Sequence, residues 1–262
     1  MRTAQPVTHE RVKFLKSLQD RKTRESEGLY LLEGARLVRD AMLAGARLPI
    51  LLVRREEEEK YQEIIAYVLA GGGQAYLGDE KALSRACATP QGICAAAALP
   101  ENAPVNGRYI LALDHVKDPG NMGTVLRTAQ AFGVSCVVLS PGCCDPFSPK
   151  CVRSAMGAHS KLSIAFTEDL PKALLSLRAK GYSVVGGHLA GQGSMPKLAQ
   201  NCVCVIGSEA DGMTEQTAAA CTALYRIPMR SNAESLNAAV AAGTLDELGP
   251  LAGVPVAFKD NM

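Results

Sequence analysis

Apolar and polar positions alternate in two distinct ways along the chain, and the first way covers roughly its first hundred residues. Val12, Leu15 and Leu18 recur at helical spacing between basic residues, which predicts an amphipathic helix near the start of the chain. Two further helices are predicted, one over residues 34–43 and one beginning at Glu56. Short apolar runs predict strands at residues 28–33, 50–53, 74–77 and 92–99.

The second pattern begins after residues 100–107, a segment rich in proline and asparagine that predicts a linker. Beyond it, apolar runs alternate with helical stretches, which is typical of βαβ units on a parallel sheet. These runs read YILALD, CVVLS, LSIAF, YSVVGG, VCVIG and YRIP. We therefore expect a smaller α/β domain over residues 1–99 and a parallel-sheet α/β domain over residues 108–262. Ligands bind beyond the carboxyl ends of parallel strands, so the loops after these runs are candidate sites.

The loop after YILALD leads into a helix that we expect to begin near Met122. Gly120 and Gly123 flank Asn121, and Arg127 follows within the helix. An asparagine amide and an arginine guanidinium near a helix N-terminus suit an anion or a ribose phosphate. A capping asparagine and a surface arginine are the purely structural alternative.

The loop after VCVIG runs from Gly207 to Gly212 and then into a helix. It lacks the lysine of a phosphate-binding loop, and no GxGxxG motif occurs in the chain, which disfavours nucleoside triphosphatases and nicotinamide enzymes. Glu209 in this loop is a candidate acceptor for a hydroxyl group. Its structural alternative is a carboxylate that satisfies free amides at a helix entry.

The third loop leads from YRIP into a helix that begins near Ser235. Ser235 and Asn237 place polar groups at the start of this helix, although helix capping alone explains a serine there. Apolar residues surround them, namely Ile227, Met229 and Leu236.

Composition and charge narrow the picture. The chain is 47% hydrophobic and 21% charged, which is typical of a globular protein. No apolar run reaches the roughly 18 residues of a membrane helix, and the N-terminus has no apolar signal core, so we expect a cytoplasmic protein without a membrane segment. Nine cysteines without zinc-site spacing predict neither disulfides nor a metal site.

The net charge of +2 does not by itself indicate a polyanionic partner. Basic side chains nevertheless concentrate in residues 1–24, where a local excess would attract phosphate groups. A solvated helix face explains the same charges on composition alone. The seven basic residues are Arg2, Arg11, Lys13, Lys16, Arg21, Lys22 and Arg24.

The three loops together resemble the SpoU (TrmH-like) family of the SPOUT methyltransferases. Residues 121–129 match N-x-G-x-x-x-R-x-A, residues 207–212 match G-x-E-x-x-G, and residues 227–237 contain I-P-M followed by S-L-N. Residues 8–98 are similar to the ribosomal-protein-like substrate-binding domain of many members.

This resemblance implies a parallel-sheet domain with a deep trefoil knot, preceded by a smaller α/β RNA-binding domain. It also implies S-adenosylmethionine as cofactor, no metal, and a homodimer. The catalytic or substrate-contacting positions that it implies are Asn121, Arg127, Glu209, Ser235 and Asn237. The cofactor-binding positions that it implies are Gly187, Gly207, Ile227, Met229 and Leu236.

The activity implied is 2′-O-methylation of a ribose in structured RNA, with large-subunit ribosomal RNA favoured by the extra N-terminal domain. A tRNA 2′-O-methyltransferase and a non-catalytic RNA-binding ribosome-assembly protein are the alternatives. A guanidinium keeps its proton at neutral pH, so we expect Arg127 to bind phosphate and stabilise developing alkoxide charge rather than act as a base.

Overall fold

Two groups of elements pack separately in the computed structural model, which describes residues 3–194, 198–208 and 210–226. Unit 1 comprises Met1–Glu101 and Asp145–Lys161, and unit 2 comprises Asn102–Cys144 and Leu162–Met262. The boundary after residue 101 falls in the predicted linker. Residues 145–161 belong to unit 1 although they lie far beyond that linker in the sequence.

Unit 1 is built on a sheet of five strands in the order β1-β4-β3-β5-β2. β1, β4 and β3 are mutually parallel, whereas β5 runs antiparallel to both β3 and β2. The strands are Gln5–Pro6 (β1), Leu29–Glu33 (β2), Ile50–Arg54 (β3), Gln74–Gly78 (β4) and Ile93–Ala98 (β5).

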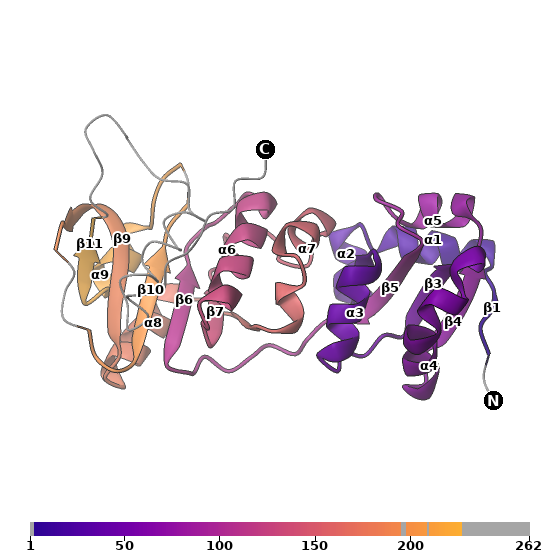
Figure 1. Cartoon of the computed structure of the whole chain (residues 1–262). Helices are drawn as coiled ribbons and strands as arrows, with labels where there is room; N and C mark the ends of the chain where they lie inside the picture. The colour runs from indigo at the N-terminus through magenta and orange to yellow at the C-terminus, as the bar shows by residue number, and fades with distance from the viewer. Residues whose placement is uncertain (1–2, 195–197, 209, 227–262) are drawn as a thin grey trace. The chain divides into compact units, whose positions relative to one another are not determined.

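Helices cover both faces of this sheet, with α1 beside α5 on one face and α3 and α4 on the other (Figure 1). Leu15 and Leu83 are fully buried where α1 and α5 meet Leu52 of β3. Burial of such side chains stabilises the unit by about 1.5–3 kcal/mol each. The α-helices are His9–Ser17 (α1), Arg21–Glu27 (α2), Ala35–Leu43 (α3), Gln62–Ala70 (α4), Glu80–Ala86 (α5) and Pro149–Ala155 (α7).

Two helix predictions for unit 1 need correction. The predicted N-terminal helix is divided, because α1 ends near Leu18 and Asp20 caps a second helix by accepting from the Thr23 amide. The helix predicted to begin at Glu56 begins at Gln62. Residues 55–61 form two 3₁₀ turns, Arg55–Glu57 and Glu59–Tyr61, and Glu57 pairs with Arg54 and Lys60.

Unit 2 is built on a six-stranded sheet in the order β11-β9-β10-β6-β7-β8, and every pairing in it is parallel. The prediction of a parallel sheet after the linker is confirmed. The strands are Tyr109–Leu113 (β6), Cys136–Leu139 (β7), Ser163–Phe166 (β8), Ser183–Gln192 (β9), Cys202–Ile206 (β10) and Ala223–Tyr225 (β11).

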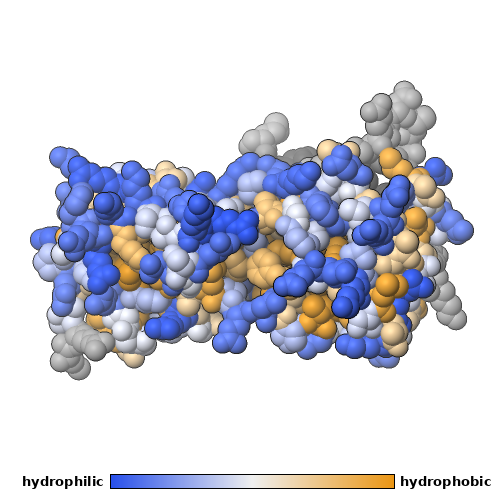
Figure 2. Space-filling view, turned by 180° about the vertical axis from the view of Figure 1, so that it is seen from behind, coloured by the Kyte–Doolittle hydropathy of each residue, from blue (hydrophilic) through white to orange (hydrophobic). Residues whose placement is uncertain are grey.

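Helices lie on both faces of this second sheet (Figure 1). One face packs against α8 (Leu170–Ala179) and α9 (Glu215–Ala220), with Leu174 among the buried residues. The other face lies against α6 (Pro119–Ala131), which buries Met122 and Leu126. Hydrophilic residues predominate on the molecular face seen in Figure 2. Within the described residues, no helix has the length and apolar character needed to span a bilayer.

Candidate functional site

The strand order of unit 2 brings the predicted site loops to one edge of the sheet. The chain proceeds from β6 outward to β7 and β8, whereas β10, β9 and β11 lie on the other side of β6. The order therefore reverses between β6 and β10, and such a switch point is where parallel sheets bind ligands. The loop after β6 (residues 114–118) and the loop after β10 (residues 207–214) meet there.

Asn121 and Arg127 both lie on α6, which leaves the β6 loop. Asp118 caps this helix by accepting a 2.8 Å hydrogen bond from the Asn121 amide, and Pro119 occupies its first turn. Asn121 is half-buried and Arg127 is exposed. The helix rises by about 9 Å between these two positions. The helix begins three residues earlier than expected because Asp118 provides the cap.

The loop after β10 closes tightly on itself. Ser208 and Gly212 form an antiparallel bridge, with amide-to-carbonyl distances of 2.9 and 3.1 Å. A Cβ atom on Gly207 would collide with backbone atoms of Gly212 and Met213, so only glycine fits there. The predicted residue Gly207 thus lies buried in a tight turn that follows β10 at the sheet edge. Glu209 lies outside the described residues.

Gly187 lies at the same edge, in β9. The preceding residue, Gly186, pairs with Val205 of β10 and Leu224 of β11, which places Gly187 level with the end of β10. The pairing of β11 then shifts to Gln192, so residues 187–191 form an irregular excursion of β9. This excursion gave no signal in the sequence.

The third predicted loop begins just after β11, the neighbour of β9. The predicted residues in it lie outside the described residues, and so does part of the chain on which the predicted knot depends. These residues are Ile227, Met229, Ser235, Leu236 and Asn237.

Asp114 is a site residue that the sequence did not reveal, and it ties the two described loops together. It lies at the end of β6 and is almost completely buried. One carboxylate oxygen accepts from the Thr214 amide at 2.8 Å, and the other lies 2.6 Å from Nδ1 of His115. On the exposed side, Lys117 pairs with Asp211 at 3.7 Å, a contact of little energetic weight in solvent.

Hydrogen bonding determines the charge of Asp114. Burial by itself raises the pKa of this carboxyl group, but hydrogen bonds from the Thr214 amide and the His115 ring outweigh it and lower the pKa below its usual value. Asp114 is therefore ionised at neutral pH. Because a carboxylate only accepts, Nδ1 of His115 carries the proton that faces it.

His115 holds a backbone conformation that few residues adopt, with a φ of 59°. Its amide donates to Oγ of Ser140 at 2.9 Å, and its ring occupies the place where a Cβ on Gly142 would lie. The loop after β7 therefore supports the loop after β6 from the other side.

Unit 1 presents most, but not all, of the predicted basic residues to solvent. Lys13, Lys16, Arg21 and Lys22 are exposed, whereas Arg24 is only 3% exposed. Arg24 is thus removed from the set of cations that can reach an RNA phosphate.

Known families match both regions of the chain. Residues 108–245 match the SpoU rRNA Methylase family, and residues 9–95 match the MRM3-like substrate binding domain. The 23S rRNA (guanosine(2553)-2′-O)-methyltransferase RlmP of Bacillus subtilis (strain 168) is 32% identical over 249 residues, covering 94% of this chain and 98% of that protein.

Solved structures agree with this similarity over nearly the whole length. An AdoMet-bound rRNA methyltransferase from Sinorhizobium meliloti has a TM-score of 0.83 and 31% identity, covering 93% of this chain and 95% of that one. A putative RNA methyltransferase of the TrmH family from Porphyromonas gingivalis has a TM-score of 0.78 and 32% identity, covering 92% and 97% of the respective chains.

Proposed function

The chain belongs to the SpoU rRNA methylase family, and from this premise we propose that it methylates the 2′-hydroxyl of a ribose in large-subunit ribosomal RNA, with S-adenosylmethionine as methyl donor. The observation that carries the proposal is the junction at the switch point of unit 2. There Asp114 joins the loop that leads to Asn121 and Arg127 to the loop that contains Gly207.

The described part of the edge fits a cofactor held largely by main chain. The space beside Gly207 is filled by the backbone of its own loop, so this position of the turn has room for main chain and not for a side chain. We assign cofactor contacts to Gly187, Gly207, Ile227, Met229 and Leu236. When bound, S-adenosylmethionine supplies a methyl group on a sulfonium, an electrophile that an oxygen nucleophile displaces.

The remaining site residues act on the RNA. Arg127 is exposed, and its planar fork binds the phosphate next to the target ribose and stabilises charge that develops on the 2′-oxygen. Asn121 and Ser235 orient the ribose, Glu209 accepts from a hydroxyl, and Asn237 holds the loop geometry. Positioning of this kind supplies much of the rate in a displacement that needs no metal.

Unit 1 binds the RNA. Its exposed basic residues on α1 and α2 release counterions when they meet phosphates, so we expect binding to weaken as salt rises. We propose that the chain acts in the cytoplasm as a homodimer, in line with the family resemblance.

Two alternative functions, methylation of tRNA and RNA binding without catalysis, are less well supported. A tRNA substrate is disfavoured because unit 1 matches a substrate-binding domain and a relative named for 23S rRNA is similar over 98% of its own length. A silent RNA-binding protein is disfavoured because every residue of the three motifs is retained in the sequence.

Labelled methyl transfer distinguishes the three functions. The full chain is incubated with S-adenosylmethionine carrying a tritiated methyl group and with either a large-subunit ribosomal RNA transcript or a tRNA pool. We expect label in the ribosomal RNA and background in tRNA. Preferential labelling of tRNA would establish the tRNA alternative, and RNA binding without labelling of either substrate would establish the silent one.

A further inference from the structure

The segment Asp145–Lys161 lies between β7 and β8 in the sequence, yet it folds with unit 1. Its helix α7 packs against β2. The chain therefore passes between the units three times, after residues 101, 144 and 161. A chain with a single linker would pass between the units only once. The two further passages place residues 145–161 in unit 1, where contacts within that unit hold them.

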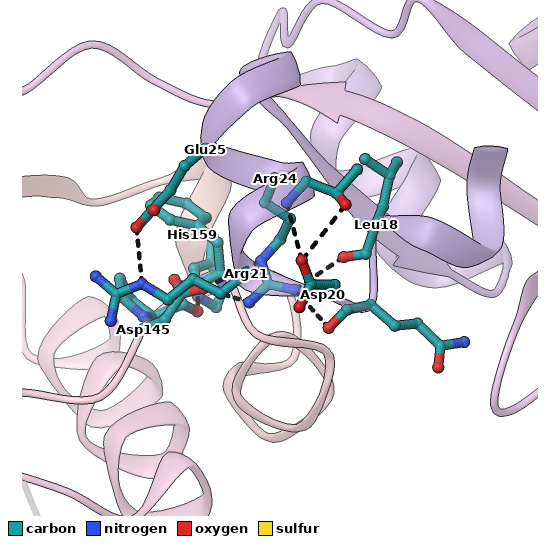
Figure 3. A network of polar contacts seen from close by, with 11 residues as sticks. Leu18, Asp20, Arg21, Arg24, Glu25, Asp145 and His159 are labelled. Atoms are coloured by element: carbon teal, nitrogen blue, oxygen red, sulfur yellow. Dashed lines mark hydrogen bonds and ion pairs between the residues drawn. The ribbon is translucent and has the colours of Figure 1, made fainter.

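Arg24 supplies the anchor at the first residue of this segment (Figure 3). Both Nε, at 3.0 Å, and Nη2 of Arg24 donate to Oδ2 of Asp145. Nη1 donates to the carbonyls of Leu18 and Gln19 at 2.8 Å each. The side chain of Arg24 is 4% exposed and that of Asp145 is 17% exposed, so water screens this ion pair only weakly.

Further contacts hold the rest of the segment. Phe147 packs at a tilt against Tyr30 of β2 with ring centroids 5.0 Å apart, and against His159 at 5.5 Å. Arg153 lies 3.6 Å from the buried carboxylate of Glu33. The segment is thus an integral part of unit 1.

The residues just before the segment belong to unit 2 and are bonded to the site loop. The Cys144 amide donates to the carbonyl of Val116 at 2.9 Å, and Sγ of Cys143 lies 3.3 Å from the carbonyl of Leu113. Ser140 accepts from the amide of His115. Residues 140–144 therefore support residues 113–116, which lead into the helix that carries Asn121 and Arg127.

We propose that Arg24 and Asp145 are positioning residues for methyl transfer. Their ion pair fixes the peptide that continues from Cys144, and through the bond from Cys144 to Val116 it fixes the loop after β6. The inference rests on the proposed function, to which it adds a physical connection between the RNA-binding unit and the catalytic loop. The connection consists of the peptide bond between Cys144 and Asp145 and the hydrogen bond from the Cys144 amide to Val116.

The loop after β6 requires such support because His115 has a positive φ, a conformation that persists only when its surroundings enforce it. Loosening residues 140–144 removes part of that enforcement. The expected consequence is a misplaced α6 N-terminus, which affects turnover rather than binding of RNA by unit 1.

Asp145→Asn is the variant that tests the role of this ion pair most directly. The second carboxylate oxygen of Asp145 accepts from the Phe147 amide at 2.8 Å, so both oxygens face donors. An asparagine must turn its NH₂ group toward one of these donors. Glu25→Gln is the matched control, because it alters an exposed pair with Arg21 on the same helix and leaves every cation in place.

We expect Asp145→Asn to lower the single-turnover methylation rate at saturating RNA by about tenfold, the scale of coupling through packed networks. KM for RNA and Kd for S-adenosylmethionine should stay within about twofold of wild type, since the pair is largely buried and neither residue is among the proposed RNA or cofactor contacts. Glu25→Gln should keep the wild-type single-turnover rate at saturating RNA. An unchanged rate in Asp145→Asn, or a loss confined to RNA affinity, would overturn the proposal.

A second variant and a second readout keep the test decisive if Asp145→Asn folds poorly. Arg24→Met combined with Asp145→Leu replaces the pair by apolar groups, a change that buried pairs often tolerate. Hydrogen exchange at the Cys144 amide should accelerate about tenfold in either variant, independently of activity. Unchanged exchange contradicts the proposed connection, whereas an unlabelled RNA with wild-type protein contradicts only the proposed function.

Discussion

His159 is buried in unit 1, where Nε2 lies 2.6 Å from the carbonyl of Pro146 and the ring packs against both Tyr30 and Phe147. Burial lowers the pKa of His159 from 6.5 to about 4, against smaller opposing effects of the Pro146 carbonyl and the Asp145 carboxylate. The folded chain therefore keeps this imidazole neutral at pH values where the unfolded chain protonates it.

Acid should consequently destabilise the protein through His159. Between pH 6.5 and pH 4 the unfolded state binds one more proton than the folded state, so stability falls as pH falls through this window. From pH 7 to pH 5 the loss is about 2 kcal/mol. Urea denaturation at both pH values should show a smaller difference in His159→Gln than in wild type. His9→Gln, at an exposed histidine, is the control and should keep the wild-type difference; equal pH dependence in both variants would contradict this account.

The sequence pattern predicts some residues of the candidate site and not others. Asn121 and Arg127 stand out because they occur within a short motif next to a strand. Asp114 does not, because its partner Thr214 lies 100 residues further along the chain. The sequence does not indicate the burial of Arg24 for the same reason, since its partner Asp145 lies 121 residues away.

Among the elements, the turn after β10 allows the most direct test of the proposed cofactor site. Gly207→Ala places a methyl group against the backbone of Gly212 and Met213, so the turn must open. We expect S-adenosylmethionine affinity, measured by calorimetry, to fall by about tenfold or more while unit 1 still binds RNA.

Gly193→Ala is the matched control for this substitution. A Cβ at Gly193 meets open space, and its φ is not in the left-handed region. The control should bind S-adenosylmethionine as wild type does. Wild-type affinity in Gly207→Ala would show that the turn does not contribute to the cofactor site.

The elements themselves follow the sequence pattern closely where burial is strong. Five of the six apolar runs of the second region coincide with strands of the parallel sheet, because strands buried on both faces read as continuous apolar runs. The sixth run, YRIP, shares only Tyr225 with β11, which covers Ala223–Tyr225. The pattern was less informative for short helices. α2 and α5 have seven residues each, too few for a periodicity to appear.

On the scale of the whole molecule, chain order and spatial grouping differ at residues 145–161. The boundary after residue 101 falls within the predicted linker at residues 100–107. No local pattern indicated that a later segment returns to unit 1, because its contacts with Arg24, Tyr30 and Glu33 are all distant in sequence. Cutting at the linker therefore does not separate the two units.

The central claim is that the chain places a methyl group on a ribose oxygen of large-subunit ribosomal RNA. The most direct measurement uses S-adenosylmethionine with a deuterated methyl group, followed by digestion of the RNA to nucleosides and mass spectrometry. We predict one labelled 2′-O-methylnucleoside, and a yield at least about 100-fold lower with Arg127→Ala, the scale seen when a charge-stabilising group is removed. Label on a base, or an undiminished yield with Arg127→Ala, would contradict the account.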